Sequence, residues 1–520
     1  MKYPSAVLLP QPASDFVHPS AKSPKSLVTG RGWSRIITRA GICFGLLATS
    51  PVVSAAEDLS VLANPKSSAM LGDYLKKRAL VLLDERDAAY EKISTPEQVK
   101  EWQKSRRETF RSALGEFPAR TPLNARVVGQ RSFSDYRIEK IIFESQPGFF
   151  VTGTLYLPLS AGPHPVVVHP TGHSEAAKAR DVYQRASVYL ARSGIACLCY
   201  DPIGQGERRQ MFADDGTTLL GTTNEHQIMG IGCTLLGTSL ARTMIWDGMR
   251  VIDYLQTRPD IDGAKIGCWG ISGGGTMTSY LGAADDRIVA SAPGCYLTEF
   301  RRLLEKLGPQ DIEQNLFNQI GRGFDQGDYV LMRAPKPTLI MAATRDFFDI
   351  GGTWNIFRQA KRAYGRLGFA ERVDLVEAPT EHTFPVEHCV AGARWFGRWF
   401  FGKELPVPEQ EVAILPEADL RSTPEGQVMR IAGARSHFDL NAEQDTALAP
   451  ARKQLWRDHP VALREVRRVT GIRSLADLPP AGVEERGELA RSGYAIRKLI
   501  LTPEPGIQLP ALRFEPKVRP

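Results

Sequence analysis

The stretch Lys265-Ile-Gly-Cys-Trp-Gly-Ile-Ser272-Gly-Gly-Gly-Thr276 decides the fold of this chain. An apolar, strand-like run leads into a glycine-rich turn that carries Ser272, and a helical pattern begins at Thr276. The Gly-x-Ser-x-Gly pattern is typical of a sharp turn that holds a nucleophilic serine in a strained backbone conformation. Only small residues fit on both sides of such a serine, and glycines occupy those positions here. The setting between a strand and a helix makes Ser272 a candidate nucleophile.

Short apolar runs surround this stretch and alternate mostly with helical patterns. Such a pattern predicts a parallel sheet that is covered by helices on both faces. Two earlier runs, Tyr136 to Glu144 and Phe149 to Leu157, alternate in polarity and predict antiparallel strands. The fold class is therefore α/β, with a mostly parallel, doubly wound sheet and antiparallel N-terminal strands. The apolar runs are Val166–His169, Ile195–Tyr200, Ile266–Trp269, Ile288–Ala292, Thr338–Ala342 and Val373–Val376.

The N-terminal residues have the composition of an export signal. Residues 39–55 combine a basic start, a short apolar centre and the small-residue ending Val53-Ser-Ala55. Residues 1–55 hold six basic residues and one acidic residue, so the net charge of +7 falls to +2 without them. No basic stripe with interleaved aromatic residues follows, so nucleic acid is not an expected partner. We expect a periplasmic or secreted protein without a stable membrane span.

The length of 520 residues exceeds one average domain, and the last part of the chain resembles an earlier part. Tyr494 to Gly506 matches Tyr136 to Gly148 without a gap, and the match continues to Pro516 against Pro158. We expect this C-terminal part to be a partial, non-catalytic repeat. The predicted parts are a leader (1–55), an N-terminal helical extension (56–129), a catalytic domain (130–402), a linker or strand-poor surface wrap (403–450) and the partial repeat (451–520).

The residues that a nucleophilic serine needs follow it in the chain. A serine hydroxyl attacks an acyl group only when a base removes its proton, and an acid must orient that base. Asp346 follows the apolar run Thr338–Ala342, and Asp349 is the alternative acid. His382 follows the last apolar run, and His388, inside the next expected helix, is the weaker candidate for the base. The sequence therefore predicts a Ser272–His382–Asp346 triad.

Acyl transfer also requires hydrogen-bond donors for the negative charge that develops on the substrate oxygen. We expect the backbone N–H of Gly273 to be one donor and that of His173 to be the other. The His173 imidazole either lines the pocket or only packs. The turn Asp201–Arg208 is expected to shape the site. Asp311 and Glu313 lie where a cap over the site is expected; contact with substrate is one interpretation of them, and a solvated helix start is the one we prefer.

With these motifs in place, residues 130–402 resemble the α/β-hydrolase superfamily, nearest the acetyl xylan esterase-like exported bacterial hydrolases. The resemblance implies hydrolysis of acetylated carbohydrates or similar small esters, with no cofactor. No metal is expected either, because no CxxC or His-x-x-x-His spacing suggests zinc. One departure concerns Gly273, because acetyl xylan esterases often have Gln after the nucleophile. The residues that carry the resemblance are Gly270–Gly274, Asp201–Arg208, Trp246–Asp247 and Thr344–Phe348.

Two alternative functions remain open, and one disulfide bond is a hypothesis. A serine peptidase uses the same triad, although residues 56–130 are too few for the large N-terminal propeller of prolyl oligopeptidases. The truncated repeat also allows a non-catalytic binding protein with a hydrolase fold. Cys233 and Cys295 lie in loop-like surroundings and are candidates for a disulfide after export. The oligomeric state does not follow from the sequence.

Overall fold

The computed structural model describes residues 58–62, 69–308, 310–407 and 410–517. The leader predicted at residues 1–55 lies outside the described residues and stays a prediction. Residues 60–520 cluster as one compact unit, and the following description concerns that unit.

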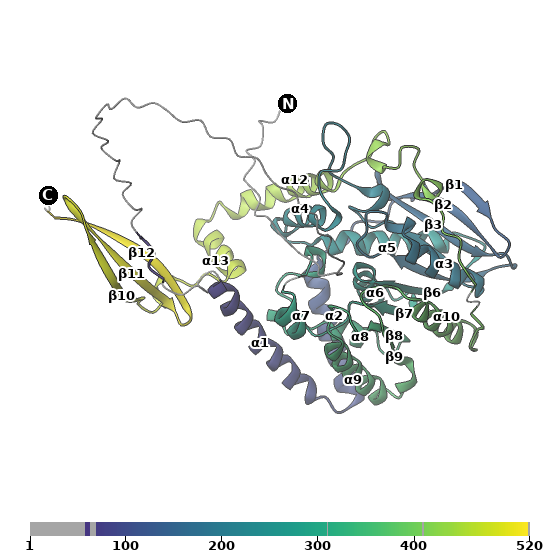
Figure 1. Ribbon diagram of the computed structural model, residues 1–520, viewed down its shortest axis with the longest axis horizontal. Helices are drawn as coiled ribbons and strands as arrows, with labels where there is room; N and C mark the ends of the chain where they lie inside the picture. The colour runs from purple at the N-terminus through teal and green to yellow at the C-terminus, as the bar shows by residue number, and fades with distance from the viewer. Residues whose placement is uncertain (1–57, 63–68, 309, 408–409, 518–520) are drawn as a thin grey trace, which may run out of the picture. The chain divides into compact units, whose positions relative to one another are not determined.

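A nine-stranded sheet forms the centre of the catalytic part (Figure 1). Its three N-terminal strands are antiparallel to one another, and β3 is also antiparallel to β5. All other neighbours in the sheet are parallel, which confirms the predicted fold class. In spatial order the strands are β1 (Arg126–Ser132), β2 (Tyr136–Gln146), β3 (Phe149–Pro158), β5 (Ala196–Tyr200), β4 (His164–Pro170), β6 (Ile261–Ile271), β7 (Ile288–Gly294), β8 (Thr338–Ala343) and β9 (Val373–Ala378). The sequence analysis missed β1, which is almost entirely exposed and therefore lacks an apolar pattern.

The central strands are buried on both faces because their side chains alternate between two apolar layers. Val166 and Val168 of β4 pack in one layer with α2, α5, α6, α8 and α9, whereas Val167 packs in the other with α3 and α10. The same division separates Cys268 from Trp269 on β6. The helices are α1 (Met70–Glu91), α2 (Pro96–Leu114), α3 (Asp181–Arg192), α4 (Thr222–Leu235), α5 (Leu240–Gln256), α6 (Gly273–Ala284), α7 (Phe300–Lys306), α8 (Gly327–Arg333), α9 (Ile350–Arg366), α10 (Val386–Phe401), α11 (Glu417–Leu420), α12 (His437–Leu455) and α13 (His459–Thr470).

A buried ion pair connects the turn after β5 to helix α5. Arg208 and Asp247 lie 2.8 Å apart, and their side chains are 0% and 1% exposed. The Arg208 guanidinium also donates to the backbone carbonyls of Phe150 and Asp201. Both members of the pair belong to the motifs that carry the resemblance, and the structure shows that they hold two elements of the catalytic part together.

The segment predicted as a linker packs against the catalytic part. The buried carboxylate of Glu207 accepts hydrogen bonds from the backbone N–H groups of Ser422 and Thr423, at 2.6 and 2.7 Å. The side chain of Gln184 on α3 bonds both backbone groups of Leu415. The boundary that we placed at residue 450 falls inside α12. Residues 410–436 are therefore a surface wrap on the hydrolase rather than a free connection.

The C-terminal residues form a separate three-stranded antiparallel sheet, drawn in yellow in Figure 1. Its strands are β10 (Gly482–Ala490), β11 (Tyr494–Glu504) and β12 (Ile507–Pro516). Their pairing repeats that of β1–β3 at a constant offset of 358 residues: Tyr494 pairs with Pro516 as Tyr136 pairs with Pro158. The register shift before Gly129 in β1 recurs before Gly487 in β10. This common register supports the proposal that the C-terminal part is a partial repeat of the catalytic one.

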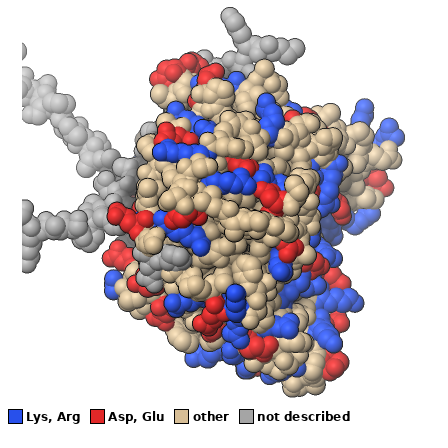
Figure 2. Space-filling view, turned by 90° about the vertical axis from the view of Figure 1, so that its right-hand side faces the viewer, with Lys and Arg blue, Asp and Glu red and all other residues tan. Residues whose placement is uncertain are grey.

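Two further features are the distribution of charge on the surface and the length of the apolar helices. On the face shown in Figure 2, basic and acidic side chains are interspersed. Among the described residues, no single helix is long and apolar enough to cross a membrane. Helices α4 and α5 reach the required length and hydropathy only as a pair, with a bend of 104° between them.

We predict that Asp247→Ala lowers the free energy of unfolding by about 3–5 kcal/mol, because it leaves the Arg208 guanidinium buried without its counter-charge. Urea unfolding followed by circular dichroism measures this change. The matched control is Asp445→Ala, which breaks a pair with Arg452 whose side chains are 56% and 48% exposed. The control is expected to leave the urea midpoint nearly unchanged. Equal losses in both variants would contradict the structural role of the buried pair.

Candidate active site

Ser272 occupies a strained turn between β6 and α6. Its backbone has φ 58° and ψ −128°, a conformation that residues with a side chain rarely adopt. The N–H of Ser272 donates to the carbonyl of Gly294 at 3.0 Å, which ties the turn to the end of β7. A Cβ atom on Gly274 would lie 2.3 Å from the carbonyl oxygen of Pro170, and one on Gly275 would lie 2.2 Å from that of Gly294. The glycines around Ser272 are thus required by the closeness of two neighbouring strands.

The predicted base and acid contact each other. Nδ1 of His382 lies 2.8 and 2.9 Å from the two carboxylate oxygens of Asp346. The Asp346 side chain is 1% exposed, and that of His382 is 21% exposed. Phe347 stacks on the His382 ring with 4.3 Å between the ring centroids. A carboxylate bonded to Nδ1 holds the imidazole in the tautomer whose Nε2 accepts a proton.

The three predicted triad residues follow β6, β8 and β9, parallel strands whose carboxyl ends lie at one edge of the sheet. Cys295 follows Gly294, whose carbonyl accepts the N–H of Ser272. The sulfur of Cys295 lies within 4.8 Å of the ligating atoms of both Asp346 and His382. That sulfur also donates to the carbonyl of Thr383 at 3.5 Å. In the described structure Ser272 and His382 form no hydrogen bond with each other, and such bonds are often long before substrate binds.

The alternative acid and base have other partners. The Asp349 carboxylate caps α9 by accepting from the N–H of Gly352 at 3.0 Å, and it pairs with Lys306. Nε2 of His388 donates to the carbonyl of Ala342 at 3.0 Å, and burial lowers the pKa of this histidine to about 4. The structure therefore brings Asp346 rather than Asp349 to the predicted base.

The two predicted oxyanion donors lie next to each other. A Cβ atom on Gly172 would lie only 3.1 Å from Cβ of Ser272, so this loop lies directly against the nucleophile turn. Gln205 donates to the carbonyl of Gly172 at 2.9 Å. Because carbonyl and N–H point in opposite directions across a trans peptide, this bond orients the His173 N–H away from Gln205. Among the described residues, the backbone N–H groups of Gly273 and His173 have no hydrogen-bond acceptor.

The His173 imidazole belongs to a cluster that the sequence analysis did not recognise. Its Nε2 lies 2.7 Å from Glu313, and its Nδ1 lies 3.3 Å from Asp311. Glu313 also faces Nδ1 of His226 at 3.3 Å. Our interpretation of Glu313 as part of a solvated helix start is wrong, because its side chain is 1% exposed. His226 was missed because it stands in a helical segment, far in the chain from the strand ends at which the other site residues were sought.

The hypothesis of a disulfide between Cys233 and Cys295 is wrong. Both thiols are free and buried. Cys233 lies in helix α4, not in a loop, and its sulfur is 3.7 Å from Nε2 of His437. The sulfur of Cys295 instead contacts Thr383, as described above.

Two groups of described side chains bring potential metal-ligating atoms within 4.8 Å of one another. They are His173, His226 and Glu313, and Cys295, Asp346 and His382. The closest atoms in the two groups are 2.7 and 2.8 Å apart. Two ligands of a tetrahedral zinc ion are about 3.3 Å apart, given bonds of about 2.0 Å. The observed distances fit hydrogen bonds, and we assign no metal to either group.

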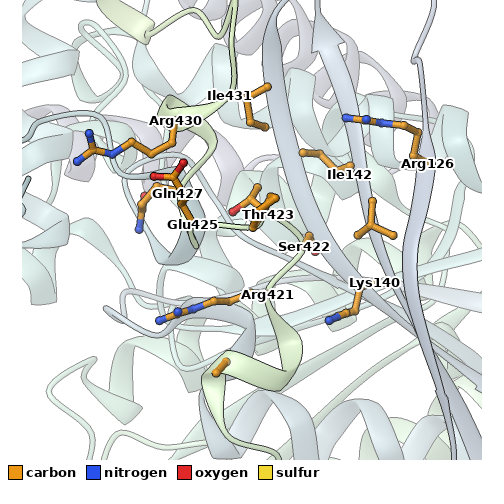
Figure 3. Close-up of a pocket in the computed structure, with 13 residues that line it drawn as sticks. Arg126, Lys140, Ile142, Arg421, Ser422, Thr423, Glu425, Gln427, Arg430 and Ile431 are labelled. Atoms are coloured by element: carbon orange, nitrogen blue, oxygen red, sulfur yellow. The ribbon is translucent and has the colours of Figure 1, made fainter.

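A cavity of about 650 Å³ lies between β1, β2 and the wrap, and none of the triad residues lines it (Figure 3). Arg126 and Lys140 line it on the strands, and Arg421 and Arg430 line it on the wrap, with their side chains directed away from those two residues in Figure 3. The location of the active site therefore follows from the geometry around Ser272 and not from this cavity.

Comparisons with known proteins concern the family and the fold. Residues 118–318 match the family model of acetyl xylan esterase (AXE1). A relative from Bacillus subtilis (strain 168), named "Putative hydrolase YtaP", is 24% identical over 316 residues, which cover 56% of this chain and 98% of the relative. The solved structure of Methylesterase BT1017 is 26% identical, with a TM-score of 0.58, and the match covers 72% of this chain and 81% of that one. The nine-stranded sheet and the serine turn give the chain an α/β-hydrolase fold, and its similarity to the acetyl xylan esterase family supports carboxylic ester hydrolysis.

Proposed function

We propose that the chain is a serine esterase that acts through a Ser272–His382–Asp346 triad and an acyl-enzyme, on acetylated carbohydrates or similar small esters. The observation that carries the proposal is the pairing of Asp346 with Nδ1 of His382, at the sheet edge where the strained turn presents Ser272. The family match supports ester chemistry, and the carbohydrate substrate is inferred from the family description.

The proposed reaction has two halves. Nε2 of His382 removes the proton of the Ser272 hydroxyl while the oxygen attacks the ester carbonyl carbon. The negative charge that develops on the carbonyl oxygen faces the N–H groups of Gly273 and His173. His382 then gives its proton to the departing alcohol. In the second half His382 activates a water molecule, which releases the acid and restores Ser272.

We expect Ser272→Ala to abolish labelling by a fluorophosphonate probe and to reduce p-nitrophenyl acetate turnover by at least about 10³-fold, because it removes the attacking oxygen. Mass spectrometry of the probe adduct locates the labelled residue. The matched control is Ser94→Ala, which changes an exposed serine before α2 and is expected to label like the wild type. Absence of an adduct on Ser272 in the folded wild-type protein would favour a binding protein with a hydrolase fold.

A second comparison separates the two candidate acids. Asp346→Asn is expected to lower kcat by about 10³- to 10⁴-fold, since the imidazole then loses the carboxylate that fixes its tautomer. Asp349→Asn, three residues away, retains an oxygen that can cap α9, and we expect less than about a threefold change. Steady-state kinetics at constant pH measure both. A greater loss in the Asp349 variant would contradict our choice of the acid.

The substrate class needs a panel of esters. We expect turnover of p-nitrophenyl acetate and of acetylated sugars, and little turnover of aminoacyl nitroanilides, if the chain is an esterase rather than a peptidase. Glucuronate methyl esters belong in the same panel, because the structural neighbour with the TM-score of 0.58 is named a methylesterase. Preference for the anilides in kcat/KM would show that the peptidase alternative is correct.

A further inference from the structure

The cluster of His173, His226 and Glu313 joins three distant parts of the chain beside the nucleophile turn. His173 follows β4, His226 lies in α4, and Glu313 lies in a short 3-10 helix, Ile312–Gln314. The rings of His173 and His226 are 5.4 Å apart. Glu313 lies between them, with one carboxylate oxygen toward each ring. The mechanism described above uses none of these three side chains.

The charge of the His173 ring is inferred from one hydrogen bond, from Nε2 to Glu313 at 2.7 Å, and from the carboxylate that lies opposite Nδ1. Both ring nitrogens of His173 face carboxylates, and an ionised carboxylate can only accept. A carboxylate opposite each ring nitrogen favours the imidazolium form of the ring, because each nearby negative charge stabilises it. Burial lowers the pKa of His173, but Glu313 and Asp311 outweigh it and raise that pKa overall. Burial likewise favours a neutral Glu313, yet His226 and His173 hold the pKa of this carboxyl well below its usual range.

The groups packed around the cluster determine which charges face the His173 ring. Nε2 of His226 lies 2.7 Å from the carbonyl oxygen of Ile203, so it carries a hydrogen. Glu225, beside His226, faces Arg209 at 3.5 Å. Glu313 also acts electrostatically on the buried phenols of Tyr280 and Tyr296, whose pKa values burial raises well above the usual range. Glu313 and Asp311 are thus the anions that directly face the His173 ring.

The His173 ring lies against the residue that follows the nucleophile. A Cβ atom on Gly273 would be 3.0 Å from Nε2 of His173 and 3.1 Å from Cε1. The N–H of Gly273 is one of the two proposed oxyanion donors, and the second belongs to His173 itself. A fixed positive charge at this position stabilises a developing oxyanion, because a partly buried site screens charge poorly.

We propose that Glu313 is a positioning residue that holds the His173 imidazole as a cation beside the oxyanion site. The inference rests on the proposed esterase function and adds to it a source of transition-state stabilisation. Glu313 is 1% exposed and bonded to His173, so in this proposal it acts through the His173 ring. The segment between α7 and α8, which supplies Glu313 and Asp311, is thereby connected to the chemistry at Ser272.

The decisive variant is Glu313→Gln, which keeps the size and hydrogen-bonding capacity of the side chain but removes its charge. We expect kcat for p-nitrophenyl acetate to fall about 10- to 100-fold with little change in KM, because the lost interaction forms in the transition state. We also expect kcat of the variant to fall as the pH rises from 7 to 9, because His173 then loses its proton. The wild type is expected to keep its kcat over this range.

Asp311→Asn is the matched control. Asp311 lies farther from the His173 ring than Glu313 does, and its side chain is more exposed. We expect a smaller loss than in Glu313→Gln. An unchanged kcat and pH profile in Glu313→Gln would overturn the proposal. A lower unfolding midpoint with an unchanged pH profile would also overturn it, because it indicates a merely structural role. If the wild type shows no more turnover than Ser272→Ala, the proposed esterase function itself fails.

Nitrogen-15 NMR of histidine-labelled wild-type protein tests the charge even if the Glu313 variant does not fold. We expect the resonances of both His173 nitrogens to be those of an imidazolium at pH 7.5, with His173→Gln assigning the signals. Resonances of a neutral imidazole at this pH would overturn the proposal.

Discussion

The close approach of three backbone segments at the nucleophile turn is the constraint on which the site depends. The carbonyl oxygen of Pro170 would lie 2.6 Å from a Cβ on Gly270 and 2.3 Å from one on Gly274, while β7 comes equally close to Gly275. Side chains at these positions would force β4 or β7 away from β6. Because both neighbours are pressed against the turn, the strained backbone of Ser272 is held from two sides. The same closeness brings the loop of His173 and the residue Cys295 into the site.

The parts of the site that the sequence could predict are those that depend on chain order and strand ends. Ser272, Asp346 and His382 each follow an apolar run, and parallel strands bring such positions to one edge. The cluster around Glu313 could not be predicted this way, because His226 and Glu313 are distant in the chain and meet only through tertiary packing. An acidic residue in a polar segment also looks solvated until the elements that bury it are known. The cysteine pairing failed for a similar reason: the surroundings of Cys233 proved to be a buried helix.

For the antiparallel strands, in contrast, the local sequence pattern is enough to predict the strands and their register. The match between Tyr494–Gly506 and Tyr136–Gly148 was visible without a gap, and hairpin register depends on loop length and side-chain alternation. The two ladders consequently have identical pairing, including the irregularity before Gly129 and Gly487. Their surroundings differ, however. In the catalytic part β3 continues into the sheet through β5 and is fully or nearly fully buried, whereas β12 is largely exposed. Register is therefore set locally, and burial is set by the neighbours.

The wrap, residues 410–436, supports the loop that carries the proposed oxyanion donor His173. This role explains why the segment packs closely although its sequence pattern is weak. Ser422 and Thr423 donate to Glu207, and Glu207 pairs at 2.7 Å with the buried ammonium of Lys178. Two residues earlier in the same turn, Gln205 donates to the Gly172 carbonyl and so orients the neighbouring N–H. A buried carboxylate without these donors would carry a large desolvation penalty, and the turn would not keep its position. The orientation of one proposed oxyanion donor thus depends on residues about 250 positions later in the chain, through a short series of polar contacts.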